Sequence, residues 1–256
     1  MKIAVLIKQV PGSESALPID SEGYWVDESS VTFVMNPPDN YALEEALLIK
    51  ESNDDVEVVI VSMGPLRVQK VIREALAKGA DRGIHILEQD ITEKDPLVIA
   101  KRLSNAIKSE EFDLVLTGLQ SDDTGMGQTG VLIGEILKMS TATLAVETII
   151  QEDHIRIKRE LESGWFQWVQ LSLPASISIQ SGLNNPRYPS LKGIMGAKKK
   201  EIRSLSATEL GKEETLQKVN NVFVPQTNKQ TEIIKGDIDQ IVSRIIEILR
   251  TDIKVI

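Results

Sequence analysis

The feature that most constrains this chain of 256 residues is the alternation of two kinds of segment along its first half. Short apolar runs, typical of strands buried on both faces, occupy residues 2–10, 56–63, 82–87 and 112–117. Segments with apolar residues at three- and four-residue spacings, as in helices that cover a sheet, occupy residues 39–48, 65–79, 96–108 and 131–137. The alternation predicts a doubly wound α/β fold with a mainly parallel sheet.

A glycine-rich segment joins the fourth apolar run to the helix that follows it. Residues 118–130 have the sequence Gly-Leu-Gln-Ser-Asp-Asp-Thr-Gly-Met-Gly-Gln-Thr-Gly. Glycine lets the backbone approach a ligand closely, and a helix N-terminus offers N–H groups and a positive dipole end to an anion. Gln128 and Thr129 stand where this helix begins, so the segment is interpreted as a cradle for a nucleotide phosphate. It lacks the signatures of a P-loop and of a dinucleotide fingerprint, and an ordinary loop without a ligand is the alternative.

Other loops are expected to meet this segment in space. Ligands of doubly wound sheets bind outside the carboxyl ends of the strands, near the point where the strand order reverses. The segments concerned are residues 9–12, 35–39, 62–65 and 117–130. Asn36 and Asp39 are typical helix-capping residues, and their short segment alone would be a plain helix entry. The expected convergence of the four segments favours a nucleotide site.

The composition argues against several other classes of function. A net charge of −9 and an aromatic content of 4% do not suit a nucleic-acid surface, which needs a basic field and stacking rings. Without cysteine the chain has no disulfide, thiolate zinc site or cysteine-ligated cluster, and with only His85 and His154 a histidine metal site is not expected. No stretch approaches the roughly 20 apolar residues of a membrane span, and residues 1–8 are too short for a signal peptide, so a soluble intracellular protein is expected.

The pattern changes in the second half of the chain. Strand-like alternation predicts antiparallel strands with one solvated face at residues 155–158, 165–171 and 175–179. A rigid proline-containing loop at residues 184–189 and a short, glycine-weakened helix at 190–197 follow. The lysines after this helix form either a solvated basic run or, with the apolar residues before them, a docking patch.

The C-terminal part is expected to pack on a partner subunit. Residues 207–235 are polar and lack periodicity, and a structureless stretch of this length usually lies on another surface. Residues 237–250 form an amphipathic helix. The predicted division is therefore a nucleotide-binding domain with its antiparallel extension and docking loop, residues 1–206, and a C-terminal arm and helix, residues 207–256.

Several motifs together resemble the β subunit of electron-transfer flavoproteins, over nearly the whole chain. They lie at residues 5–10, 35–37, 42–46, 63–65, 73–85, 118–130 and 184–200. The last is the most specific, because Asn-Asn-Pro-Arg-Tyr-Pro from Asn184 is followed by Leu191, by Ile194-Met195 and by three lysines.

The resemblance implies a sheet of the adenine-nucleotide-binding type and a heterodimer with an α subunit that holds most of the redox-active FAD. In that family the β subunit binds AMP in ordinary carriers and a second FAD in electron-bifurcating members that oxidise NADH. Carried over by motif, the nucleotide contacts are Leu6, Asn36, Pro37, Pro38, Asp39, Met63, Gly118, Leu119, Gln120, Ser121, Asp122, Asp123, Thr124, Gly125, Met126, Gly127, Gln128 and Thr129. The Thr129 hydroxyl at a helix N-terminus suits a terminal phosphate, so we expect AMP.

The family's docking loop maps onto residues 184–200, with Leu191 as the anchor that enters a pocket of a partner dehydrogenase. The residues expected to take part are Tyr188, Leu191, Ile194, Met195, Lys198, Lys199 and Lys200. The implied partners are an acyl-CoA or related flavin dehydrogenase and a membrane quinone oxidoreductase, in the cytoplasm or the mitochondrial matrix. Gly193 and Gly196 replace bulkier residues common in the family, and Phe166 stands where some members have a carboxylate.

A nucleotide-binding regulator of the universal-stress type is the alternative from another class. It shares the doubly wound sheet and the glycine-rich phosphate loop, but it has no use for the C-terminal arm or for residues 184–200. No base, nucleophile and orienting group can be assembled from the sequence, so an electron-transfer subunit without catalytic residues or a metal is expected rather than an enzyme. At least one of the adjacent Asp122 and Asp123 is expected to contact a ribose or stabilise the loop rather than form an acid–base pair.

Overall fold

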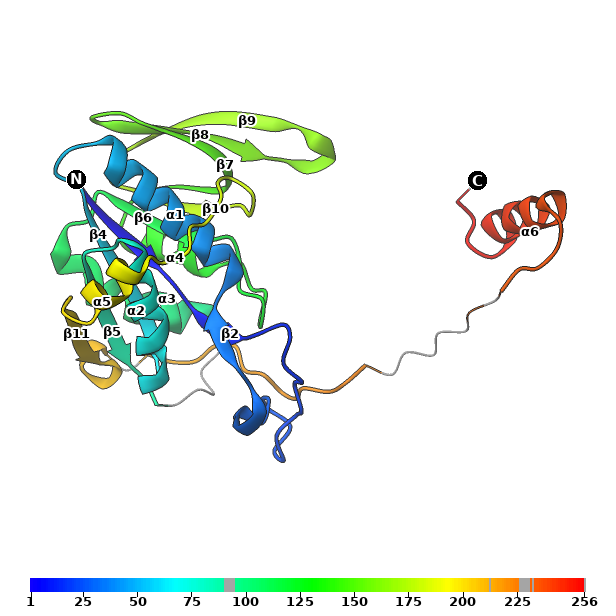
Figure 1. Ribbon diagram of the computed structural model, residues 1–256, viewed down its shortest axis with the longest axis horizontal. Coiled ribbons are helices and arrows are strands. Elements are labelled where there is room, and N and C mark those ends of the chain that lie inside the picture. The colour runs from blue at the N-terminus through cyan, green and yellow to red at the C-terminus, as the bar shows by residue number, and fades with distance from the viewer. Residues whose placement is uncertain (90–94, 212, 226–230, 232, 256) are drawn as a thin grey trace. The chain divides into compact units, whose positions relative to one another are not determined.

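The computed structural model describes residues 1–89, 95–211, 213–225, 231 and 233–255. Within them nine strands form one sheet, in the order β11-β5-β4-β1-β6-β10-β7-β8-β9 (Figure 1). In that order their bounds are Ile202–Ser206, Arg82–Leu87, Glu57–Gly64, Lys2–Leu6, Leu114–Gly118, Ala175–Ile179, Ser140–Ile150, His154–Glu160 and Phe166–Ser172. Strands β11 to β7 run parallel, and β8 and β9 continue the sheet antiparallel. The predicted doubly wound, mainly parallel sheet with an antiparallel segment is confirmed.

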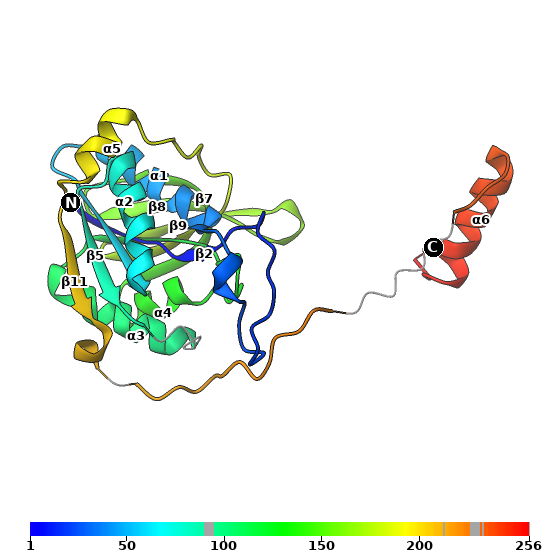
Figure 2. The same ribbon diagram turned by 60° about the horizontal axis from the view of Figure 1, so that its bottom comes forward.

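Helices cover both faces of this sheet (Figure 2). On one face α1 (Pro37–Ser52), α2 (Gln69–Lys78) and the short α5 (Leu191–Ala197) share a core with Ile3 and Val5 of β1. On the other, α3 (Pro96–Ile107) and α4 (Thr129–Ile136) share a core with Ala4 and Leu6. Alternate residues of β1 thus point into two separate cores, which explains why its apolar run is continuous. Short 3-10 helices lie at Glu28–Ser30, Leu66–Val68, Lys108–Glu110, Glu162–Gly164 and Ala207–Leu210.

The strand order reverses beside β1. From β1 the chain passes through α1 to β4 and through α2 to β5, moving outward on one side. Helix α3 then carries it back to β6, on the opposite side of β1. The loops that leave the carboxyl ends of β1 and β6 therefore diverge to opposite faces, which opens the crevice where doubly wound sheets bind ligands.

Strand β10 shows that one prediction was wrong. The alternation in residues 175–179 predicts an antiparallel strand with a solvated face, but β10 lies between β6 and β7, is parallel to both, and is buried along its whole length. Its serines face α4 instead of water, and Ser176 Oγ donates to the carbonyl oxygen of Gly130 at 3.0 Å. A central strand of a sheet covered on both faces has no solvated side, so its polar residues are small hydroxyls that the neighbouring helix covers.

Other differences from the prediction lie at the ends of strands. The first apolar run divides into β1 and β2 (Gln9–Pro11), and β2 pairs with β3 (Phe33–Met35) in a small antiparallel sheet within residues 9–35. Strands β7 and β11 have no counterpart in the sequence prediction. Strand β11 extends the parallel sheet beyond β5 and leads directly into the 3-10 helix Ala207–Leu210, whose Ala207 is buried in the core.

The chain divides into two compact units, Met1–Val222 and Phe223–Ile256. Residues 213–222 belong to the first unit, where Asp95 Oδ2 accepts hydrogen bonds from the N–H groups of Leu216 and Gln217 at 2.8 and 3.1 Å. The predicted domains, residues 1–206 and 207–256, stay a prediction. Residues 212, 226–230 and 232 of the predicted arm lie outside the described residues.

The second unit contains the predicted amphipathic helix, α6 (Ile238–Thr251). A capping box begins it, because Asp237 accepts from the N–H of Gln240 while the Gln240 side chain accepts from the N–H of Asp237. Its apolar residues Ile238, Val242 and Ile245 are exposed within the described part of the chain. No helix among the described residues is long and apolar enough to cross a membrane.

Candidate nucleotide-binding site

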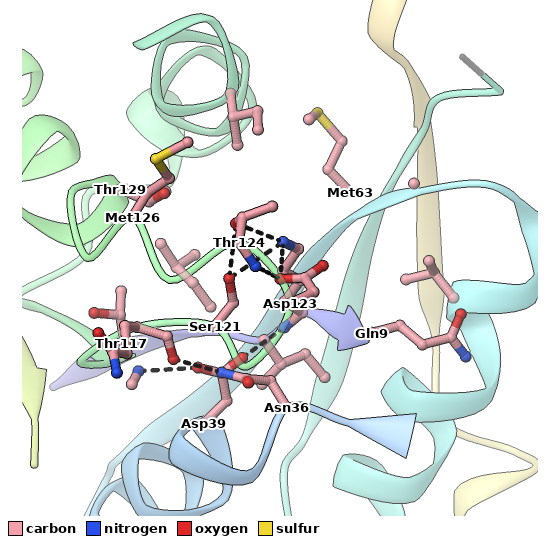
Figure 3. A pocket seen from close by; sticks show the side chains of 18 of the residues that line it. Gln9, Asn36, Asp39, Met63, Thr117, Ser121, Asp123, Thr124, Met126 and Thr129 are labelled. Carbon is pink, nitrogen blue, oxygen red and sulfur yellow. Dashed lines mark hydrogen bonds and ion pairs between the residues drawn. The ribbon is translucent and has the colours of Figure 1, made fainter. Parts of the chain in front are cut away.

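The carboxyl ends of β1, β4 and β6 surround one cavity (Figure 3). Of the predicted nucleotide contacts, those in its wall are Leu6, Asn36, Asp39, Met63, Gly118, Leu119, Gln120, Ser121, Asp123, Thr124, Met126, Gly127, Gln128 and Thr129. Pro37, Pro38, Asp122 and Gly125 lie in the same segments beside the wall. The structure thus brings together the four loop segments that were expected to meet, and the nucleotide contact of each residue stays a prediction.

Asp39 joins the first turn of α1 to the ends of two strands. Its Oδ2 accepts from the N–H of Lys8 at 2.7 Å, and its Oδ1 accepts from the N–H of Gly118 at 3.1 Å. A Cβ atom at Gly118 would overlap Oδ1 of Asp39 and lie 2.7 Å from the carbonyl carbon of Pro38, so this position requires glycine. Burial raises the pKa of Asp39 to about 7, against the opposing effect of these hydrogen bonds.

Asn36 holds the glycine-rich loop rather than projecting into open space. Its Nδ2 donates to the carbonyl oxygen of Gln120 at 3.0 Å, and its Oδ1 accepts from the N–H of Asp122 at 3.0 Å. Both ends of the amide are therefore occupied by loop backbone. Asn36 was expected to contact the nucleotide, and this geometry gives its side chain a positioning role.

Lys8 ties the same loop to the end of β1. Its Nζ lies 2.6 Å from Oδ1 of Asp123 and 3.3 Å from Oγ of Ser121. Burial raises the pKa of Asp123, but the charge and hydrogen bond of Lys8, together with the hydrogen bonds of Ser121 and Thr124, leave the pKa of this carboxyl below its usual value. The ammonium group of Lys8 is thus neutralised by the carboxylate of Asp123. Of the two adjacent aspartates, Asp123 stabilises the loop through this ion pair.

The N-terminus of α4 opens onto the cavity without a side-chain cap. Gln128 occupies the N-cap position and its side chain makes no capping hydrogen bond. Gly125 and Gly127 take φ of 62° and 63°, which turns the loop back toward the helix at positions that favour glycine. The first-turn N–H groups of Thr129, Gly130 and Val131 have no intrahelical acceptor at such an end, so they are available to an anion.

A further part of the cavity wall was not predicted from the sequence. It includes Trp25 and Phe33, which lie between β1 and α1, and Arg67, which follows β4. The Arg67 guanidinium lies 3.7 Å from the centre of the Phe33 ring and 2.7 Å from Oε1 of Glu28. Phe33 begins β3 and Arg67 lies in the 3-10 helix Leu66–Val68, and nothing in the local sequence pattern indicates that they meet at this end of the sheet.

Comparison with known proteins identifies the family. The sequence model of the electron transfer flavoprotein domain matches residues 24–210. The electron transfer flavoprotein subunit beta of Methylophilus methylotrophus is 37% identical over 259 residues, covering 97% of this chain and 98% of that protein. The corresponding subunits of Bacillus subtilis and Homo sapiens are 31% and 34% identical, with 100% and 98% of both chains covered. The chain belongs to the electron transfer flavoprotein β-subunit family.

The Asn-Asn-Pro-Arg-Tyr segment, residues 184–188, is anchored on α1 by two of its side chains. Arg187 forms ion pairs with Glu44, at 2.9 Å, and with Glu51. Asn184 Nδ2 donates to Oε2 of Glu45 at 3.1 Å. The hydrogen bonds from Arg187 to the two glutamates raise the pKa of the guanidinium above its usual value. The carboxylates of α1 therefore hold the first part of residues 184–200 in place.

Helix α5, in the same predicted docking loop, packs closely on α2. A Cβ atom at Gly193 would overlap the carbonyl oxygen of Ala77, which explains why a bulkier residue is absent at this position. Lys200 Nζ donates to the carbonyl oxygens of Leu76 and Ala80 at 3.0 and 2.5 Å, and burial lowers the pKa of Lys200. The ammonium of Lys200 thus completes the end of α2, whereas it was expected to face a partner.

The remaining predicted docking residues face outward. Leu191 is 82% exposed at the start of α5, directly after Ser190, whose Oγ accepts from the N–H of Gly193 at 3.0 Å. The other exposed members of the set are Tyr188, Ile194, Met195, Lys198 and Lys199. The exposure expected for Leu191 is confirmed, and its contact with a partner stays a prediction.

Proposed function

We propose that this chain is the β subunit of a heterodimeric electron-transfer flavoprotein and that it binds AMP in the cavity at the end of its sheet. The relatives that match it end to end are named as beta subunits, which supports an α partner. FAD, held mainly by the α subunit, supplies the redox chemistry. This chain binds the nucleotide and presents docking surfaces, so it is an electron-transfer subunit rather than an enzyme.

The observation that carries the proposal is the uncapped N-terminus of α4 at the cavity wall. The two cations that the described residues place in that wall, Lys8 and Arg67, are already paired with Asp123 and Glu28. A phosphate there is therefore bound by neutral N–H and hydroxyl donors and by the helix dipole. Thr129, at the first position of the helix, has its hydroxyl in this donor set.

The charge of the cavity wall favours one phosphate group over a longer phosphate chain. Among the described residues the wall carries four carboxyl groups, those of Glu28, Asp39, Glu88 and Asp123, against the two cations Lys8 and Arg67. Because the carboxyl groups outnumber the cations, the further negative charge of a second phosphate is less well balanced than that of one. This supports AMP as the ligand and an ordinary single-flavin carrier as the class of complex.

A second FAD in place of AMP, with NADH oxidation, is the alternative candidate. The observation that favours it is the aromatic part of the wall, where Trp25 and Phe33 offer flat apolar surface beyond the phosphate loop. Such surface suits a further ring system joined to the adenine nucleotide.

The composition of the purified complex distinguishes the two candidates. The chain is coexpressed with its α subunit, the complex is purified and denatured, and the released nucleotides are quantified by chromatography. One FAD and one AMP per complex are expected. Two FAD without AMP would replace the proposal by the bifurcating alternative, and a colourless chain without an α subunit would contradict both.

The exposed residues of α5 and its flanks are proposed to dock a flavin dehydrogenase of the acyl-CoA or a related type, with a membrane quinone oxidoreductase as the further partner. An exposed leucine at the tip of a well-anchored segment is the kind of apolar anchor that protein interfaces use. The family assignment disfavours the universal-stress alternative. Cytoplasmic localisation stays a prediction.

A further inference from the structure

One buried polar side chain of the cavity wall has no hydrogen-bond partner among the residues that the structure describes. Thr117 is the next-to-last residue of β6 and is only 6% exposed. Its Oγ1 has neither a hydrogen-bond donor nor an acceptor within reach in the described part of the chain. Buried hydroxyls are normally hydrogen-bonded, since an unpaired one loses its interaction with water without replacement. The Thr117 hydroxyl therefore lacks a partner that a ligand of the cavity can supply.

The surroundings of Thr117 indicate which chemical group that is. A Cβ atom placed on Gly130 would lie 2.6 Å from Oγ1 of Thr117, so the hydroxyl lies against the first turn of α4. This is the turn whose N–H groups lack a side-chain cap. The hydroxyl and the helix N-terminus come from different elements and are thus two independent donor sets beside one part of the cavity wall.

We propose that the Thr117 hydroxyl is a ligand of the nucleotide phosphate and donates a hydrogen bond to one of its oxygens. The inference rests on the proposed function and deepens it, because it assigns to the phosphate a residue outside the glycine-rich segment 118–130. Lys8 is held by Asp123 at 2.6 Å, so recognition depends on neutral donors such as this one. The hydroxyl is then unsatisfied in the nucleotide-free protein and satisfied in the complex.

A neighbouring strand provides a matched control. Ser178 of β10 lies opposite Thr117 in the strand register, is 5% exposed, and also has an Oγ without a partner in the described residues. Unlike Thr117, it does not line the cavity. Both hydroxyls are costly to bury, but only that of Thr117 is placed to be satisfied by a ligand. Removing each should therefore affect stability similarly and nucleotide binding differently.

The test uses the complete complex with its α subunit, freed of bound adenine nucleotide. Wild type, Thr117→Val, Thr117→Ser and Ser178→Ala are titrated calorimetrically with AMP and with adenosine, which lacks the phosphate. Thr117→Val should weaken AMP binding about 10- to 100-fold, the range for one lost hydrogen bond to a charged group. Thr117→Ser should restore most of the affinity, Ser178→Ala should bind like wild type, and adenosine should not distinguish the variants.

Thermal unfolding of the nucleotide-free complexes separates recognition from folding. Thr117→Val and Ser178→Ala should unfold at or above the wild-type temperature, because each removes an unpaired buried hydroxyl. Thr117→Ala replaces the valine variant if valine prevents folding.

Three results would overturn the inference, and they show whether the assignment of Thr117 alone or the proposed function fails. If wild type binds AMP and Thr117→Val binds it equally well, the assignment of Thr117 is wrong while the proposed function stands. The same holds if adenosine binding falls as much as AMP binding. If wild type binds neither AMP nor another adenine nucleotide, the proposed function itself fails, and the assignment fails with it.

Discussion

Asp39 joins three segments that are distant in the sequence. It belongs to the first turn of α1, and its two carboxylate oxygens accept N–H groups from Lys8 and Gly118. The ammonium of Lys8 acts electrostatically on this carboxyl group and is itself paired with Asp123. A carboxylate can satisfy both N–H groups at once, whereas an amide has a single acceptor atom. The residue therefore both positions the cavity wall and brings a titrating group into it.

The raised pKa of Asp39 predicts a pH dependence of stability. Its pKa is about 7 in the folded chain, and an aspartate in an unfolded chain titrates near pH 3.9. Between these values the folded state holds the extra proton, so the contribution of Asp39 to the free energy of unfolding falls as pH rises from about 4 to 7. Urea unfolding of wild type and Asp39→Asn across this range should show wild type losing stability relative to the variant. Parallel pH profiles would contradict the prediction.

Helix α1 connects the candidate nucleotide site to the predicted docking loop. Its first turn carries Asp39, and its later turns carry Glu44, Glu45 and Glu51, which hold Asn184 and Arg187. Glu44 and Glu45 are buried although they are charged. Their carboxyl groups contact a guanidinium and an amide instead of solvent, which is how buried charged side chains are stabilised. The face of α1 opposite its apolar stripe is thus used for anchorage.

Substitution by alanine is expected to have opposite effects at the two glycines of α5, Gly193 and Gly196. Gly193→Ala places a methyl group on the carbonyl oxygen of Ala77, so it should displace α5 and with it Leu191. Gly196→Ala meets nothing within 4 Å and should strengthen the helix by up to about 1 kcal/mol.

Stopped-flow electron transfer between the complex and its dehydrogenase measures the difference. The rate should fall for Gly193→Ala and stay at the wild-type value for Gly196→Ala, while the absorption spectrum of the bound FAD is unchanged in both. Equal rates for the two variants would show that the position of α5 does not matter for docking. A changed flavin spectrum would show that the substitution disturbs the α subunit instead.

At the scale of the whole molecule, the two units use their apolar residues differently. The unit Met1–Val222 encloses two cores on either side of its sheet. The unit Phe223–Ile256 buries none of the residues of α6, and the apolar side chains of this helix remain exposed within the described residues. An amphipathic helix without a core of its own gains stability by packing on another surface. This supports the α subunit as the surface that receives it.

Truncation after Val222 tests that role of the second unit. The shortened chain retains both cores, so it should unfold cooperatively near the wild-type temperature but no longer copurify with the α subunit. Truncation after Thr251, which keeps all of α6, is the matched control and should leave the complex intact. Copurification of the shorter truncation product would place the subunit contact in the first unit alone.

The types of secondary-structure element and the location of the candidate site could be predicted from the sequence alone. Strands buried on both faces need continuous apolar runs, and helices that cover them need apolar residues at helical spacing, so both are visible locally. The glycine-rich turn between β6 and α4 could also be recognised locally, because its backbone requires residues that permit positive φ. From this alternation the doubly wound sheet and the edge that carries the cavity followed.

Which strands pair and which side chains meet depends on the tertiary structure. The direction of β10 depends on its pairing with β6 and β7, and its alternating pattern could not reveal that a helix covers the serines. Likewise, Lys8 and Asp123 are 115 positions apart, and Lys200 lies 120 positions from the carbonyl of Ala80 that it caps. A polar side chain has the same local pattern whether it meets water, a helix end or a ligand. Its role is decided by long-range packing, which the pattern of neighbouring residues does not record.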